Sequence, residues 1–239
     1  MSKTAEPAPP DSSLLPDAVR RRLRDHWLTA ALDEHASIGS FARFSLHLLG
    51  VGAPPTLLEA AHRAGIDEIE HARLCFRLAS AYAGEPLGPG PLPVGGDLLG
   101  DVDLVSMAVA TALEGCVEET LAAIEAQYAA GVATEPAVRH YLEVIAADEG
   151  RHAELAWATV RWALEVGGDD VREALAEALA PEALVAAARH GEDEEPPSAA
   201  AEALLVAHGW LPKATIGGLR ARAIERVLLP ATRALLGRD

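Results

Sequence analysis

The 239-residue chain lacks several features that would place it in other classes of protein. It has two cysteines, Cys75 and Cys116. This low number of cysteines argues against a disulfide scaffold and favours a reducing compartment. Cys75 is interpreted as a small core residue. Aromatic residues make up 4% of the chain and long stretches lack proline, whereas alanine and leucine dominate. This composition favours helices over sheet. No uninterrupted apolar run approaches the roughly 20 residues needed to span a bilayer.

Positive charge is also scarce, with 20 Lys and Arg against 36 Asp and Glu and a net charge of −16. Nucleic acid and anionic membrane surfaces need a positive face, so neither is expected as a partner. The polar, proline-rich start, MSKTAEPAPPDSS, has no apolar stretch of a signal peptide. We therefore predict a soluble, cytoplasmic protein. Half of the residues are hydrophobic, which is enough for a sizeable core.

Proline and glycine divide the chain into segments. Residues 1–16 are predicted to form a flexible tail, and Asp17 to cap the first helix. The expected helices span 17–49, 56–83, 101–130, 135–165, 169–190, 198–208 and 216–236. Short turns join the first two and the next two, whereas GEPLGPGPLPVGGD is long enough to cross from one end of a bundle to the other. This order predicts an all-α four-helix bundle with one long crossover over residues 17–167, and a C-terminal helical extension over 168–239 packed on it.

The second and fourth predicted helices share the motif D-E-x-x-H-A-x-L, as DEIEHARL and DEGRHAEL. Its recurrence indicates that the chain is built from two related helix pairs. A spacing of three residues places Glu68 and His71 on one helix face, one turn apart, and does the same for Glu149 and His152. Each pair can therefore reach one metal ion.

Two further glutamates stand at matching distances from these motifs. Glu34 precedes Glu68 by 34 residues, and Glu114 precedes Glu149 by 35. In antiparallel helices joined by a short turn, such spacings place each lone glutamate at about the height of its motif. Four carboxylates and two imidazoles would then converge inside the bundle, as in di-iron and di-manganese carboxylate sites. Oxygen and nitrogen ligands without thiolate suit iron or manganese.

In these motifs the sequence resembles the ferritin-like superfamily of bacterioferritins, rubrerythrins, manganese catalases and di-iron oxygenases. The resemblance covers about residues 17–167. It implies two bound iron ions, with manganese as the other choice, and Glu68 and Glu149 as the bridging ligands. The implied metal ligands are Glu34, Glu68, His71, Glu114, Glu149 and His152.

Other acidic residues near the motifs have two interpretations. Glu118, four residues after Glu114 on the same face, is either a seventh ligand or a solvent-facing residue. Glu119 is turned by roughly 140° from Glu114 in an α-helix and is less attractive as a ligand. Asp67 and Asp148 can each accept the free ring N–H of a ligating histidine from a neighbouring helix, or can lie on the surface.

The proteins that the sequence resembles share chemistry with oxygen or peroxide. We predict a di-iron carboxylate oxidoreductase that activates O2, as an oxidase or oxygenase acting on a small organic substrate with an external electron donor. The alternatives are a ferroxidase that handles iron, and removal of H2O2 by a rubrerythrin-like or manganese-catalase-like enzyme. Another interpretation is a bundle that binds metal only for stability or serves as an interaction module. The protein is a homodimer in one further interpretation.

Overall fold

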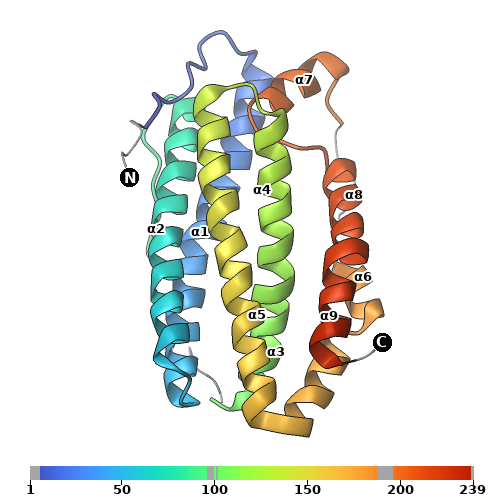
Figure 1. The fold of residues 1–239 in the computed structure, drawn as a ribbon. Helices are drawn as coiled ribbons and strands as arrows, with labels where there is room; N and C mark the ends of the chain where they lie inside the picture. The colour runs from blue at the N-terminus through green and yellow to red at the C-terminus, as the bar shows by residue number, and fades with distance from the viewer. Residues whose placement is uncertain (1–5, 96–99, 101, 188–195, 238–239) are drawn as a thin grey trace.

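The computed structural model describes residues 6–95, 100, 102–187 and 196–237, and within these ranges the chain is helical and contains no strand. Its first long helices are α1 (Asp17–Gly50) and α2 (Pro55–Ala83). A continuous third rod consists of α3 (Leu104–Ala110), the π-helical segment η1 (Thr111–Glu119) and α4 (Thr120–Val132), and is followed by α5 (Pro136–Ala178). These four rods pack side by side along their lengths (Figure 1). None of the described helices has the length and apolar composition that crossing a membrane requires.

Proline and glycine set the helix ends, as expected. Pro55 is the first residue of α2, where its missing N–H costs nothing, and Gly84 ends that helix in the left-handed conformation with φ 77°. The predicted cap at Asp17 is wrong. Pro16 holds the cap position without a side-chain hydrogen bond, and Asp17 is the first helical residue. Its carboxylate instead accepts a hydrogen bond from Arg20 at 2.9 Å.

The connection between α2 and α3 leads from one end of the bundle to the other. Near its start, the backbone N–H of Leu87 donates to the hydroxyl of Ser80 at 2.9 Å, close to the end of α2. Near its end, the side chain of Val102 lies against Gly50, the last residue of α1. Because α1 and α2 are antiparallel, these two contacts lie at opposite ends of the pair (Figure 1). The described parts of this connection therefore have the course expected of a crossover.

Helix α5 runs further than the 135–165 that the sequence predicted. It continues to Ala178, with a kink at Gly168, whose φ of 60° and ψ of −135° are not helical. Glycine adopts such a backbone without the steric penalty that a side chain would impose. The kink redirects the end of α5 (Figure 1), and Leu175 beyond it is buried in the core.

The C-terminal helices pack on the outside of the bundle. They are α6 (Pro181–Ala187), α7 (Ala199–Ala207), α8 (Lys213–Ala223), the π-helical η2 (Ile224–Leu228) and α9 (Leu229–Leu236). Helix α7 contacts α1 and α4, α8 contacts α4, and α9 contacts α5 (Figure 1). The predicted stretch 188–190 and the acidic residues 191–195 lie outside the described residues.

The described part of the predicted flexible tail also contacts the bundle. The hydroxyl of Ser12 donates to the carbonyl of Ala81 at 2.8 Å. The carboxylate of Glu6 accepts a hydrogen bond from the hydroxyl of Tyr141 at 2.9 Å and forms an ion pair with Arg73. Residues 1–5 lie outside the described residues.

A buried polar layer divides the apolar core into two clusters. On α2, Ala64 belongs to one cluster and Ala72 to the other. On α5, Ile145 and Leu155 are divided in the same way. Cys75 is buried in the core, as predicted. The layer between the clusters holds both Glu-x-x-His motifs. Buried charges are costly unless they are paired, so this layer is the candidate functional site.

Candidate metal centre

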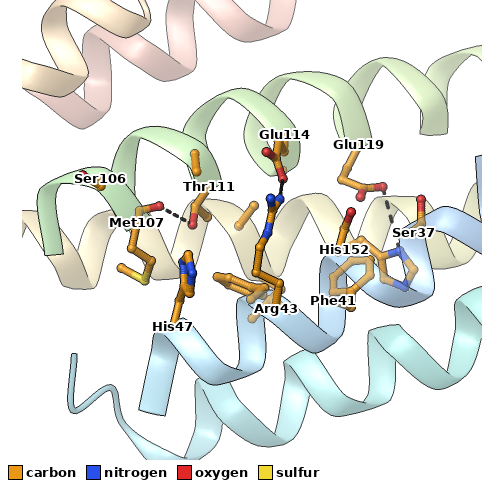
Figure 2. A pocket seen from close by; sticks show the side chains of 16 residues that line it. Ser37, Phe41, Arg43, His47, Ser106, Met107, Thr111, Glu114, Glu119 and His152 are labelled. Atoms are coloured by element: carbon orange, nitrogen blue, oxygen red, sulfur yellow. Dashed lines mark hydrogen bonds and ion pairs between the residues drawn. The ribbon is translucent and has the colours of Figure 1, made fainter. Parts of the chain in front are cut away.

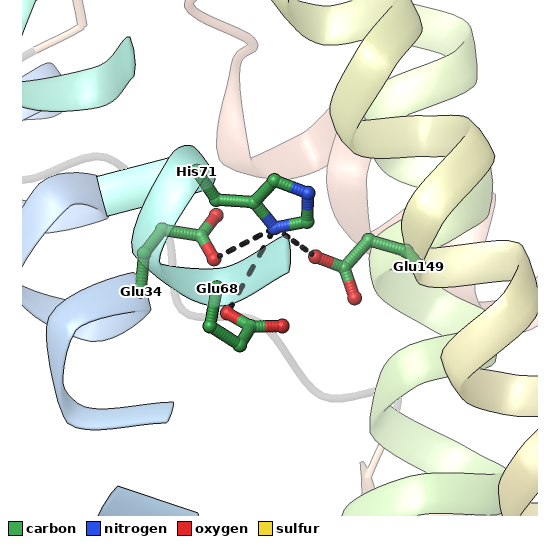
Figure 3. Close-up of side chains that lie close together, drawn as sticks. All are labelled: Glu34, Glu68, His71 and Glu149. Atoms are coloured by element: carbon green, nitrogen blue, oxygen red, sulfur yellow. Dashed lines mark ion pairs between the residues drawn. The ribbon is translucent and has the colours of Figure 1, made fainter. Parts of the chain in front are cut away.

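Three carboxylates surround one ring nitrogen of His71 (Figure 3). The Nδ1 atom of His71 lies 3.5 Å from Glu34 Oε2, 3.8 Å from Glu68 Oε2 and 3.3 Å from Glu149 Oε1. The ring of His71 is fully buried, and Glu68 and Glu149 are buried beside it. One ligand atom from each of the four residues lies within 4.8 Å of every other. This group could hold a metal ion.

A second group forms around His152. Its Nδ1 atom lies 3.1 Å from Glu68 Oε1, 3.4 Å from Glu149 Oε2 and 3.9 Å from Glu119 Oε2. Glu68 and Glu149 thus present one oxygen to each histidine, and the two imidazole centroids are 5.9 Å apart. Glu68 and Glu149 therefore lie between the two groups, where a bridging ligand has to lie.

Aspartates from the opposite motif contact the other side of each histidine ring. The Nε2 atom of His71 lies 3.1 Å from Asp148 Oδ2, and that of His152 lies 3.5 Å from Asp67 Oδ2. Of the two interpretations that the sequence leaves for these aspartates, the contacts favour the one in which they support the histidine rings. Arg151 forms ion pairs with both of them. Such contacts fix a ring so that its other nitrogen faces a metal, and here both Nδ1 atoms face the carboxylates.

Unpartnered atoms test whether these residues suit a metal. The buried Glu68 Oε2, His71 Nδ1 and His152 Nδ1 make no hydrogen bond within the described residues. A buried polar atom left unpaired costs about 1–3 kcal/mol, so a cluster of them at one place needs a compensating partner. Carboxylate oxygen and imidazole nitrogen are donors that iron and manganese accept. The donor set therefore fits divalent metal ions.

The electrostatics of the cluster lead to the same conclusion. Burial, together with neighbouring carboxylates, raises the pKa of Glu34 to about 8 and that of Glu119 to about 11. Burial alone would lower the pKa of His152, but contacts with Glu149 and Glu68 raise it to about 9. Negative charge on Glu34 and Glu119 is therefore unfavourable unless protons or another cation balance it. Divalent cations bound to the same atoms would displace these protons.

The predicted ligand position Glu114 needs correction, and of the two interpretations of Glu118 the structure favours the solvent-facing one. The side chain of Glu114 is 59% exposed, and its carboxylate accepts a hydrogen bond from Arg43 at 2.7 Å. Glu118 is exposed as well and forms an ion pair with Arg220 at 3.3 Å. The structure brings neither residue into the cluster. Glu119, which an α-helical register disfavours, joins it instead.

The π-helical segment η1 explains this difference. It spans Thr111–Glu119, so its hydrogen bonds run five residues apart, and residues five apart diverge much less around the helix axis than the roughly 140° of an α-helix. Figure 2 shows Glu114 and Glu119 along one side of this segment, both at the same pocket. A Cβ at Gly115 would lie 2.5 Å from the Cβ of Ala156, so glycine allows a close approach to α5. Gly115 is a visible signal in the sequence, but it does not reveal the π register.

A pocket of about 240 Å³ lies beside the cluster, between α1, the α3–η1 segment and α5 (Figure 2). Glu119 and His152 form part of its wall. Phe41 also lines it and packs edge-on against the ring of His152, with centroids 5.0 Å apart. The pocket therefore gives a small molecule access to the edge of the cluster.

Comparisons of the chain with family models, curated proteins and solved structures gave no match. The functional interpretation accordingly depends on the geometry of the cluster and of its pocket.

Replacing Asp148 with alanine tests the support of His71. We expect Asp148→Ala to weaken metal binding by about 10–100-fold, because the ring of His71 loses the acceptor that orients it. Competition with a coloured chelator measures this change. Asp25→Ala is the matched control, since Asp25 is exposed on α1 and pairs with the adjacent Arg24. Equal affinities of the two variants would refute a supporting role for Asp148.

Proposed function

We propose that the protein is a ferritin-like di-iron carboxylate oxidoreductase that uses O2 to oxidise a small organic substrate. The observation that carries this proposal is a mainly apolar pocket that shares a wall with the buried carboxylate–histidine cluster. Manganese is the other metal that the same donors accept. The residues that would hold the two metal ions are Glu34, Glu68, His71, Glu119, Glu149 and His152.

Each part of the cluster has a distinct task in this proposal. Two bound Fe²⁺ ions would together supply two of the four electrons that reduction of O2 to water requires, and the organic substrate or the external donor would supply the other two. Glu68 and Glu149 hold the two positions together, because each presents an oxygen to both histidines. Asp148 and Asp67 fix the orientation of the rings. Apolar side chains such as Phe41 limit water at the pocket wall and leave space for a substrate next to the cluster.

The pocket also separates this proposal from its alternatives. The mainly apolar surface of the pocket, with Phe44 and Met107 in its walls, suits an organic molecule better than hydrated Fe²⁺. Removal of peroxide requires no organic pocket of this kind. The need for an external electron donor and the cytoplasmic location stay predictions.

Metal content and reaction with O2 test the proposal. The protein is purified, stripped of metal and reconstituted without oxygen with Fe²⁺, Mn²⁺ or, as a redox-inert control, Zn²⁺. We expect two ions per chain and O2 consumption by the iron protein that stops once the bound iron and supplied electrons are used. Fewer than about 1.5 ions per chain would contradict a two-metal site. Continuous conversion of excess Fe²⁺ to mineral would instead indicate storage, and rapid O2 evolution from H2O2 a catalase.

A further inference from the structure

The pocket beside the cluster combines apolar walls with one guanidinium group. Its volume, about 240 Å³, is below the range of roughly 300–1,000 Å³ that is typical of ligand pockets, so its ligand is small. Most of its surface is apolar, and its larger apolar side chains are Phe41, Phe44, Met107 and Leu155. A ligand that fills this space therefore has a largely hydrocarbon body.

The guanidinium of Arg43 reaches from α1 across the pocket to η1, where it donates to Glu114 (Figure 2). Within the described part of the chain, Glu114 is its hydrogen-bonding partner. The pair is partly exposed, with side-chain exposures of 35% for Arg43 and 59% for Glu114. Such pairs contribute little to stability, so the guanidinium can change its partner at low cost.

The two members of this pair are not equivalent. Glu114 is the more exposed one, so its carboxylate can turn into water when the pair opens. Arg43 is the less exposed one and lines the pocket, as does His47, one turn further along α1. A guanidinium matches a carboxylate with two parallel N–H donors. An incoming anion therefore has a better site here than an incoming cation.

We infer that the pocket binds a small, mainly apolar organic acid whose carboxylate replaces that of Glu114 on Arg43. The acid is the substrate class of the oxidation proposed above, so this role rests on the proposed function, whereas its binding does not. In Figure 2, Arg43 lies between the end of the pocket at His47 and the end at His152. An acid held at Arg43 can direct its hydrocarbon part toward Phe41 and the cluster.

Binding of matched probes to the full chain tests this inference. Octanoate, octanamide and octylamine share one hydrocarbon body and differ in charge, and phenylacetate with phenylacetamide repeats the comparison with an aromatic body. Calorimetry is performed on the Zn²⁺-loaded and on the metal-free protein without O2. We expect each acid to bind at least about tenfold more tightly than its amide, as a charge-assisted hydrogen bond to Arg43 predicts.

Substitutions of the two paired residues are expected to act in opposite directions. Arg43→Gln lowers the affinity for octanoate to that for octanamide, whereas Glu114→Gln raises it several-fold, because it removes the competing carboxylate. Arg24→Gln is the matched control on α1, where Arg24 pairs with Asp25 away from the pocket, and leaves the affinity unchanged. Ala110→Leu narrows the pocket and weakens binding of all three octyl probes.

The outcomes separate this inference from the proposed function. Any one of three results would overturn the inference. The acids bind no more tightly than their amides, octylamine binds more tightly than octanoate, or Arg43→Gln leaves the affinity for octanoate unchanged. A chain that binds two metals and consumes O2 but shows one of these results loses only the substrate class. A chain that prefers the acids through Arg43 but holds fewer than about 1.5 metal ions loses only the proposed function.

Discussion

Glu149→Ala is expected to remove at least one metal ion from the chain while the helices stay formed. The side chain presents Oε1 to His71 at 3.3 Å and Oε2 to His152 at 3.4 Å, so its loss takes a ligand from both groups. The apolar clusters on either side of the polar layer are not touched by this change. Metal per chain after reconstitution and desalting measures the first effect, and far-ultraviolet circular dichroism measures the second.

Glu154→Ala is the matched control, because Glu154 is exposed on the same helix, five residues further on. It is expected to keep two metal ions per chain. Glu149→Gln keeps the volume of the side chain and one carbonyl oxygen, so its metal content should fall between those of Glu149→Ala and the unchanged protein. Retention of both ions in Glu149→Ala would show that the bridging assignment is wrong.

Much of the fold and most of the cluster could be predicted from the sequence, because both follow from regular geometry. An α-helix relates its positions by about 100° per residue, so each Glu-x-x-His motif defines one face. A short turn between antiparallel helices relates their heights, which is why Glu34 lies beside His71 at 3.5 Å. The same reasoning places Asp148 and Asp67 against the histidines of the opposite motifs.

The features that escaped prediction depend on contacts between segments far apart in the chain. An α-helical register was assumed for 101–130, whereas η1 widens the helix over nine of those residues. Gly115 permits the close packing on Ala156 that accompanies this segment, but a glycine alone has many interpretations. Helix α5 likewise continues beyond 165, because Leu175 packs into the core past the kink. Local sequence contains neither of these tertiary contacts.

The final prediction follows from the register of η1. It compares the substitution of glutamate by glutamine at two positions that are five residues apart. Glu119→Gln is expected to weaken metal binding at the His152 group by more than about tenfold, since loss of an outer contact alone already has an effect of that size. Glu114→Gln should leave metal affinity unchanged, because its carboxylate pairs with Arg43 outside the cluster.

Chelator competition on the two variants, with circular dichroism to confirm equal helix content, measures the difference. Both substitutions replace a glutamate by a neutral amide of the same shape in one short segment, so a general effect of the substitution on this segment would change both affinities alike. An α-helical register would give the opposite order, with Glu114 as the ligand and Glu119 turned away by about 140°. A selective loss in Glu119→Gln therefore tests the π-helical turn itself, because only that turn places Glu119 next to His152 while Glu114 stays on the pocket with Arg43.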